Sequence, residues 1–285
     1  MNRLLFFLLE KMLLVLASRA PSQLALGLQI FEKYFSNQPD RLYAVCQEYA
    51  GRKQWFFRFI AGKYLGRFYL KEPTKVITLL EELAVDPVWQ VREGAAWGIA
   101  TLWDLTDNSV LDCYSRWLGD EREYLRATAA LSLVPVIKKG DPALLPLLIP
   151  LLDQLVVDES KVVRKLIGSQ IVGKILAETF PETAYECLQR WVVLPNAVTQ
   201  WQIARAVPGP LADSFPGGVM DILRSIQYHD QPMTSQALFS ALKRLSHSTN
   251  PELVLAAQKY AEEIGATTAE KQASLRSKEH ANEGL

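Results

Sequence analysis

One acidic and one aromatic residue are spaced so that they could serve a common site. Glu93 and Trp97 lie four residues apart, so an α-helix would place a carboxylate and an indole on one face. Trp201 and Arg205 repeat that spacing with a cation. Aromatic and arginine side chains are the types that most often anchor a partner. With two lysines at corresponding positions, they form the candidate partner-binding set: Lys63, Glu93, Trp97, Lys165, Trp201 and Arg205.

These residues stand one and five places after an arginine or glutamine that recurs along the chain, on the side of the helix opposite its apolar stripe. In a stack of helix pairs, that side of the second helix would line the concave surface. The alternative interpretation is that Trp97 and Trp201 are core residues, because large aromatic side chains are usually mostly buried.

No other pattern in the sequence favours catalysis. The three histidines, His229, His247 and His280, include no pair at the four-residue spacing of a helical metal site, and the cysteines lack CxxC spacing. Glycine-rich phosphate loops and nucleophile elbows are absent, and the prolines and glycines of 208–218 favour turns between helices. We therefore expect no catalytic residue, no metal and no cofactor, and so no enzyme.

The elements that carry the candidate residues recur with a period of about three dozen residues. The segments QWFFRFIAGKYLG, VWQVREGAAWGIA, REYLRATAALSLV and KVVRKLIGSQIVG align without gaps on Arg58, Arg92, Arg126 and Arg164. Two further copies carry glutamine at the anchor position, and prolines near the starts of the intervening segments keep the same period. A period of this length, made of two short helices, is typical of an α-solenoid.

The apolar spacing within each period is helical, and no stretch alternates as a strand would. The sequence predicts helices at 3–18, 21–34, 40–51, 54–68, 74–84, 88–104, 108–118, 121–137, 142–155, 160–177, 182–192, 198–207, 216–228, 234–247 and 251–264. The expected fold is all-α, a right-handed superhelix of about seven antiparallel helix pairs. We expect a capping helix pair at 1–38, a solenoid at 39–265 and a mobile polar tail at 266–285.

An apolar run near the N-terminus imitates a secretory signal. Glu10 and Lys11 interrupt it, and Arg19 stands where a cleavage site requires small residues. We expect instead an amphipathic helix that caps the stack, and no membrane span. Cys46, Cys113 and Cys187 are too few for a disulfide framework, so the chain is expected to be cytoplasmic, with reduced thiols.

An aspartate stands six residues before three of the recurring arginines. This spacing resembles HEAT repeats, in which an aspartate in the turn between two helices and a Val-Arg pair of the second helix recur. Such an aspartate can accept the backbone N–H groups at the start of a helix, and the arginine can pair with it or with the aspartate of the next repeat. We assign six residues to this structural ladder: Asp86, Arg92, Asp120, Arg126, Asp158 and Arg164.

Charge is balanced overall and uneven locally. The chain has 31 basic and 31 acidic residues, which disfavours a polyanion as the main partner. Residues 41–75 nevertheless contain eight basic and two acidic residues, interleaved with aromatic residues, whereas 76–120 contain two basic and eight acidic residues. Basic and aromatic residues together can bind nucleic acid through phosphate contacts and stacking. They can also serve helix packing and complement the acidic stretch.

Two functions are compatible with these observations. The favoured one is a non-enzymatic HEAT-repeat scaffold or adaptor that binds a protein partner through its concave face. The alternative follows from an architecture that is similar to the AlkD-like DNA alkylation repair glycosylases, which use tryptophans and an acidic residue to hold and assist a damaged nucleotide. That resemblance implies these roles for Glu93 and Trp97, supported by Lys63, Lys165, Trp201 and Arg205. The HEAT-like bilin lyases share only the repeat class.

Overall fold

The chain folds into α-helical elements arranged in two compact units. The computed structural model describes residues 3–17, 21–104, 108–227 and 231–265, and every regular element in these ranges is helical. Unit 1 comprises residues 1–136 and unit 2 residues 137–285. The expected all-α class is therefore confirmed, and helices pair in chain order within each unit.

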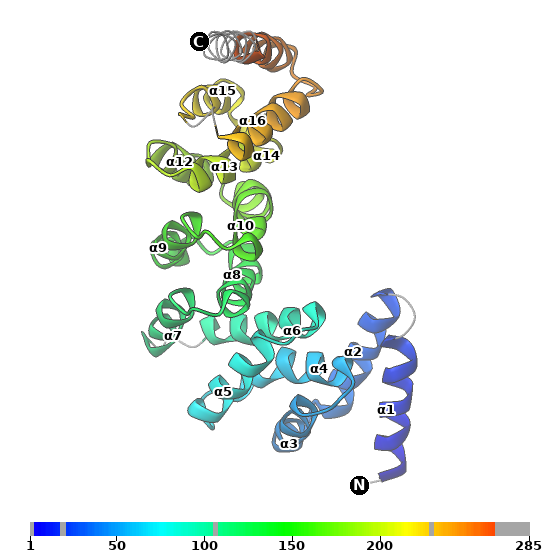
Figure 1. Ribbon diagram of the computed structural model, residues 1–285. Coiled ribbons are helices and arrows are strands. Elements are labelled where there is room, and N and C mark those ends of the chain that lie inside the picture. Colours follow the sequence, from blue (N-terminus) through cyan, green and yellow to red (C-terminus); the bar gives the residue numbers. More distant parts are fainter. Residues whose placement is uncertain (1–2, 18–20, 105–107, 228–230, 266–285) are drawn as a thin grey trace, which may run out of the picture. The chain divides into compact units, whose positions relative to one another are not determined.

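Unit 1 is built from helix pairs joined by short turns (Figure 1). Its core is apolar and rich in aromatic residues, with Phe31, Tyr49 and Tyr64 fully buried. The elements are α1 (Arg3–Ala17), α2 (Pro21–Phe35), α3 (Pro39–Ala50), α4 (Trp55–Leu65), η1 (Gly66–Phe68), α5 (Pro73–Ala84), α6 (Trp89–Ala100), η2 (Thr101–Asp104), α7 (Asn108–Leu118) and α8 (Glu123–Lys138), whose last residues belong to unit 2.

Unit 2 also consists of helix pairs, and one of its helices is longer and irregular. That helix runs without a break through an α-helical start, a π-helical middle and an α-helical end. The elements are η3 (Pro142–Leu144), α9 (Leu145–Val156), α10 (Lys161–Leu166), η4 (Ile167–Leu176), α11 (Ala177–Thr179), α12 (Pro181–Val192), α13 (Ala197–Ala206), α14 (Pro210–Ser214), α15 (Pro216–Arg224) and α16 (Pro232–Leu245), followed by helical residues 251–265.

Each predicted helix has a counterpart, and one expected turn region is helical. The segment 208–218 contains the five-residue helix α14, because Pro210 fits the first helical turn and Leu211 and Ala212 are buried. The proposed domain boundaries stay a prediction, and the expected mobile tail and His280 lie outside the described residues. In the part of the chain that is described, no helix is both long and apolar enough to span a bilayer.

Prolines begin many of these helices, as their spacing predicts. Helices α3, α5, α12, α15 and α16 all have proline in the first turn. Proline suits this position because its missing N–H would have no intrahelical acceptor there. Where no proline is present, a polar side chain can cap the helix: Ser160 caps α10, and Asn196 caps α13.

The first helices of two repeats, one in each unit, share the sequence Cys-x-x-Arg-Trp. In α7 the indole N–H of Trp117 donates to Glu81 over 2.6 Å, and Arg116 bonds the same carboxylate at 3.0 Å. In α12 Trp191 and Arg190 each donate to Asp153 over 2.6 Å. Both tryptophans are buried, so a carboxylate from the preceding helix pair satisfies each indole.

The ladder residues bind mostly to the backbone of the turns. Asp86, Asp120 and Asp158 each accept the backbone N–H two residues ahead, at 2.8, 2.9 and 2.7 Å. Arg92 and Arg126 of the ladder, and Arg58 at the equivalent position before them, each donate to the carbonyl oxygens six and five residues behind them. Arg58 also forms a bidentate pair with Asp86 of the next repeat, at 2.7 and 3.1 Å. The guanidinium of Arg164 lies 5.2 Å from the centre of the Trp201 ring.

Candidate functional site

Helices α4 and α6 approach each other so closely that their backbones touch. A Cβ on Gly62 would lie 2.6 Å from the amide nitrogen of Ala95, and one on Gly98 would overlap the carbonyl oxygen of Gly62. Glycine at these positions is therefore required for the packing. The contact holds the two helices in register, so that residues 34 apart in the sequence face the same side.

The register creates two parallel rows of side chains, each with four-residue spacing. On α4 the row is Trp55, Phe59 and Lys63; on α6 it is Trp89, Glu93 and Trp97. The ammonium of Lys63 lies 5.0 Å from the centre of the Trp97 ring, a cation–π contact between the rows. Trp97 is 43% exposed and Trp89 is 60% exposed, whereas Glu93 between them is half-buried.

The burial of the two charges near Trp97 changes both of their pKa values. Desolvation raises the pKa of Glu93, and the positive charge of Lys63 opposes part of that rise. Desolvation likewise lowers the pKa of Lys63, and the charges of Glu32 and Glu93 oppose it. Each charge thus depends on the other for stabilisation in a partly dehydrated setting. A carboxylate held beside exposed indoles can stabilise a cation or accept a proton.

A second aromatic–cation cluster lies on unit 2. The guanidinium groups of Arg164 and Arg205 each lie 5.2 Å from the centre of the half-buried Trp201 ring. Lys165 and Arg205 are exposed. The structure thus brings together Lys63, Glu93 and Trp97 in one unit, and Trp201 and Arg205 in the other.

Sequence reasoning missed three aromatic residues beside the first cluster. Trp89 precedes Glu93 by one helical turn, and Trp55 holds the same place on α4, so the 34-residue period could have revealed both. Tyr124, 39% exposed at the start of α8, lies under the guanidinium of Arg92 at 4.3 Å. The position one residue after the recurring arginine, which selected Glu93, also selects Phe59 on α4. Phe59 is buried because it packs against Gly94.

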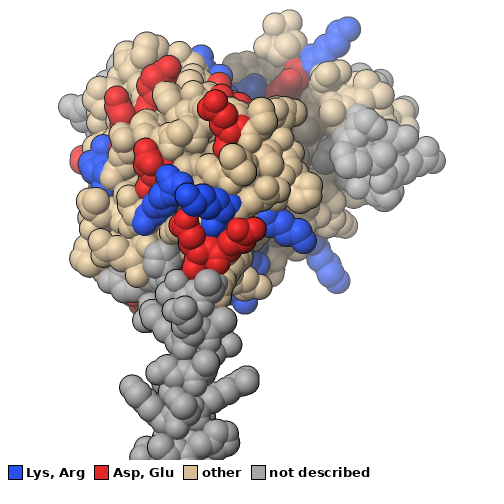
Figure 2. All heavy atoms as spheres, turned by 90° about the horizontal axis from the view of Figure 1, so that it is seen from above, with Lys and Arg blue, Asp and Glu red and all other residues tan. Residues whose placement is uncertain are grey.

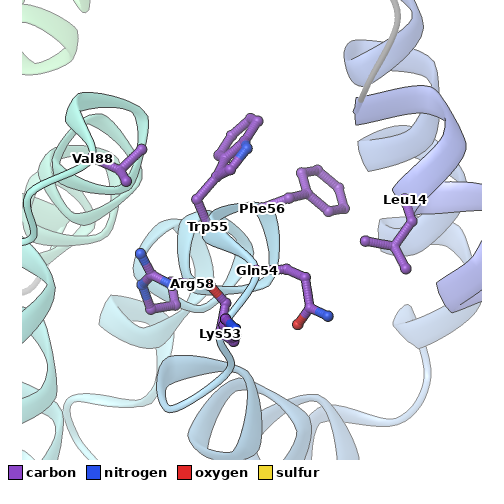
Figure 3. Close-up of a pocket in the computed structure, with 7 residues that line it drawn as sticks. All are labelled: Leu14, Lys53, Gln54, Trp55, Phe56, Arg58 and Val88. Carbon is purple, nitrogen blue, oxygen red and sulfur yellow. Dashed lines mark hydrogen bonds between the residues drawn. The ribbon is translucent and has the colours of Figure 1, made fainter.

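A cavity of about 360 Å³ opens at the start of α4 (Figure 3). Figure 3 shows Phe56 directed towards Leu14 of α1, with Trp55 beside it and Val88 on the opposite side of the helix end. Its wall is mostly apolar, with polar side chains from the turn before α4. The lining residues are Leu14, Lys53, Gln54, Trp55, Phe56, Arg58 and Val88.

Acidic and basic side chains are interspersed on the face drawn in Figure 2, where neither sign forms a continuous field. Several ion pairs link neighbouring repeats: Arg67 with Glu32, Arg116 with Glu81, and Arg190 with Asp153. These pairs neutralise charge locally, so the total charge of the chain does not describe any one surface.

The family model for DNA alkylation repair enzymes matches residues 19–172, which include both rows and most of unit 1. The chain belongs to this family. Among solved structures, two engineered proteins from the Northeast Structural Genomics Consortium match at 14% and 15% identity, each with a TM-score of 0.35. Both alignments cover 81% of this chain, with 99% and 97% of the other chains. No curated protein matches the sequence.

Membership of this DNA alkylation repair family corrects two expectations from the sequence. The prediction of a non-enzymatic scaffold is wrong, because the family is one of enzymes. The prediction of a protein partner, with nucleic acid disfavoured, is also wrong, because DNA is the substrate that the family name gives. The error came from the net charge: a zero total hides one basic and one acidic stretch that are adjacent in the sequence.

Proposed function

We propose that this protein binds DNA and hydrolyses the bond between deoxyribose and an alkylated base. The observation that carries the proposal is Glu93, a partly desolvated carboxylate between two exposed indoles on α6. Alkylation of a purine ring nitrogen gives the base a positive charge. The face of an indole attracts such a cation, and Trp89 and Trp97 are both exposed, although Lys63 lies over one face of Trp97.

The reaction requires stabilisation of a second positive charge. As the bond from C1′ to the base nitrogen breaks, its electron pair leaves with the base, which becomes neutral, and the sugar becomes cationic. Water then adds its oxygen to C1′ and releases a proton. A carboxylate at this point stabilises the cationic sugar and can accept the proton of the water. We assign this role to Glu93, and assign to Lys63 the positioning of Trp97.

Unit 2 supplies a contact of a different kind. Arg164 and Arg205 flank Trp201, and Lys165 follows Arg164 on the same helix. Guanidinium and ammonium groups bind phosphates, and an aromatic ring held between two guanidiniums limits the conformations that they sample. We propose that Lys165 and Arg205 contact the DNA backbone without selecting the damaged base, and that Trp201 holds Arg205 in place for this contact.

The repeats themselves are proposed to be HEAT-like, with the six ladder residues in a structural role. The bidentate pair of Arg58 with Asp86 supports this, because it links one repeat to the next through the turn. DNA as the substrate favours the cytoplasm as the site of action, and Cys46, Cys113 and Cys187 are free thiols, which fits that compartment.

The binding step can be tested by fluorescence polarisation of labelled duplex DNA at two salt concentrations. We expect binding that weakens steeply with salt, because phosphate contacts release counterions. Absence of binding at low salt would contradict the proposal. The same titration with Arg205→Ala tests the assignment of unit 2, since the variant should bind more weakly with a smaller salt dependence.

The chemical step can be tested by release of base from N-alkylated duplex DNA. Glu93→Gln should lower the single-turnover rate by about 100-fold or more, because it removes the charge that stabilises the sugar cation. Glu82→Gln is the matched control, since Glu82 is an exposed glutamate on α5, and it should leave the rate unchanged. Normal release by Glu93→Gln at saturating DNA would exclude Glu93 from the reaction.

A further inference from the structure

We propose that the cavity at the start of α4 receives one unpaired purine base of the bound DNA. The inference depends on the proposed function, because it takes DNA as the ligand. The volume of about 360 Å³ is within the range of small-molecule sites and has room for a planar two-ring base. Neither Glu93 nor Trp97 lines the cavity, so we treat its occupant as a different base from the one at Glu93.

The walls suit a flat aromatic ligand. Leu14, Phe56 and Val88 supply apolar surface, and Trp55 meets Phe56 edge to face, with ring centres 5.9 Å apart and planes at 86°. A base in the cavity can therefore stack on Trp55, which is half-buried, while Phe56 holds the Trp55 ring in place. Phe56 is 2% exposed, so its position is fixed by the core of unit 1.

The rim carries groups that could recognise a base and its phosphate. Gln54 occupies the position before α4, but its side chain makes no capping hydrogen bond and is exposed. A free glutamine amide can donate and accept at once, which matches the N6 and N7 edge of adenine. Lys53 beside it is exposed and can reach a phosphate. Arg58, by contrast, is paired with Asp86.

Two observations favour a DNA base over other occupants. First, the lining contains no carboxylate, and the exposed Lys53 adds a positive charge that Arg58, paired with Asp86, does not, so the site is complementary to an anion attached to an aromatic ring. Second, the cavity is continuous with the two rows: Trp55 begins the row on α4, and Val88 directly precedes Trp89 on α6. DNA bound along the rows would thus bring its strand to the cavity.

Opening a base pair costs energy that stacking in the cavity would offset. The cost is least for a base that has no partner, so a strand with one unpaired purine should bind best. We expect wild-type protein to bind a duplex with a single extra adenine about tenfold more tightly than a duplex with an abasic analogue at that point. Both duplexes carry the same extra sugar and phosphate and differ only in the base.

Two variants test the cavity itself. Trp55→Ala should reduce the preference for the extra adenine to about twofold or less, because it removes the stacking surface. Gln54→Ala changes an exposed side chain and should reduce the preference about threefold while leaving the fold intact. Gln236→Ala, an exposed glutamine of α16, is the control and should keep the full preference. Affinity for fully paired DNA should remain the same in Gln54→Ala and Gln236→Ala, so these two variants carry the test of the preference.

The possible failures can be told apart. If wild-type protein binds paired DNA with salt dependence but shows no preference for the extra adenine, the inference is wrong and the proposed function stands. Preference retained by both cavity variants would also overturn it. If adenosine monophosphate abolishes the preference at concentrations that leave binding to paired DNA unchanged, the cavity serves a free nucleotide instead. Absence of binding to every duplex would contradict both proposals.

Discussion

A tryptophan with a cation over its ring occurs on α6 of unit 1, where the cation is Lys63 of α4, and on α13 of unit 2, but only α6 adds a carboxylate. Both helices pack closely on a neighbouring helix through glycine: Gly98 against α4, and α13 against Gly173 of η4. Trp97 has Glu93 one helical turn before it, whereas Trp201 has Ala197 at that position. One scaffold thus carries a site with a charge suited to catalysis and a site suited to binding alone.

The two tryptophans also differ in their exposure and in the number of cations over their rings. Trp97 is 43% exposed with one lysine over it, so part of its ring is available to a ligand. Trp201 is half-buried and covered by two guanidiniums, so its ring orders the cations rather than offering a free face. Aromatic residues at similar positions in two repeats therefore need not share a role.

The largest effect is expected from the glycine contact that sets the rows in register. Gly98→Ala should lower the free energy of unfolding by about 3 kcal/mol, because the new Cβ would overlap the carbonyl oxygen of Gly62. Gly217→Ala is the control: a Cβ there meets nothing within 4 Å, and alanine favours a helix. Urea denaturation measures both. A Gly98→Ala protein as stable as wild type would show that α4 and α6 can move apart without loss of stability.

Replacing each tryptophan separates the two roles. Trp97→Ala should lower the rate of base release at saturating DNA about tenfold, because the cationic base loses a ring face. Trp201→Phe should weaken DNA binding and leave that rate unchanged. Single-turnover kinetics over a range of DNA concentrations separates rate from affinity. Equal losses of rate in both variants would contradict the proposal that Trp97 serves the reaction and Trp201 serves binding.

The arginine over Trp201 should have a smaller effect. Arg205→Ala removes one phosphate contact, so the slope of log affinity against log salt should fall by about 1. The loss should be the same for alkylated and unmodified duplexes, as measured by fluorescence polarisation. A loss confined to alkylated DNA would instead place Arg205 at the damaged base.

The smallest effect concerns the pH dependence of base release. The carboxylate of Glu93 must be ionised, so activity should fall as pH drops through its pKa, which desolvation raises and Lys63 partly lowers. Lys63→Met removes the opposing charge, so the pKa of Glu93 should rise further and the acid limb of the profile should move to higher pH. We expect a shift of less than about one pH unit, since Glu93 is half-buried. A shift to lower pH would show that the two charges do not interact.

The sequence predicted the helices because their signals are local. Prolines at 39, 73 and 216 begin helices, and a constant period placed Arg58 and Arg92 at equivalent positions. The sequence also identified Glu93 and Trp97 as candidate site residues, because four-residue spacing on a helix is a short-range property. It misjudged the partner, because a sum of charges contains no information about where they lie.

The all-helical class, the repeat and the choice of Glu93 with Trp97 follow from periodicity along one chain, so they could be predicted from the sequence. Three features required the packed structure: Lys63 lies over Trp97, Phe59 is buried while Trp89 is exposed, and a cavity opens beside Trp55. They required it because burial and desolvation depend on what packs against a side chain. Here that was set by glycine contacts between helices 34 residues apart.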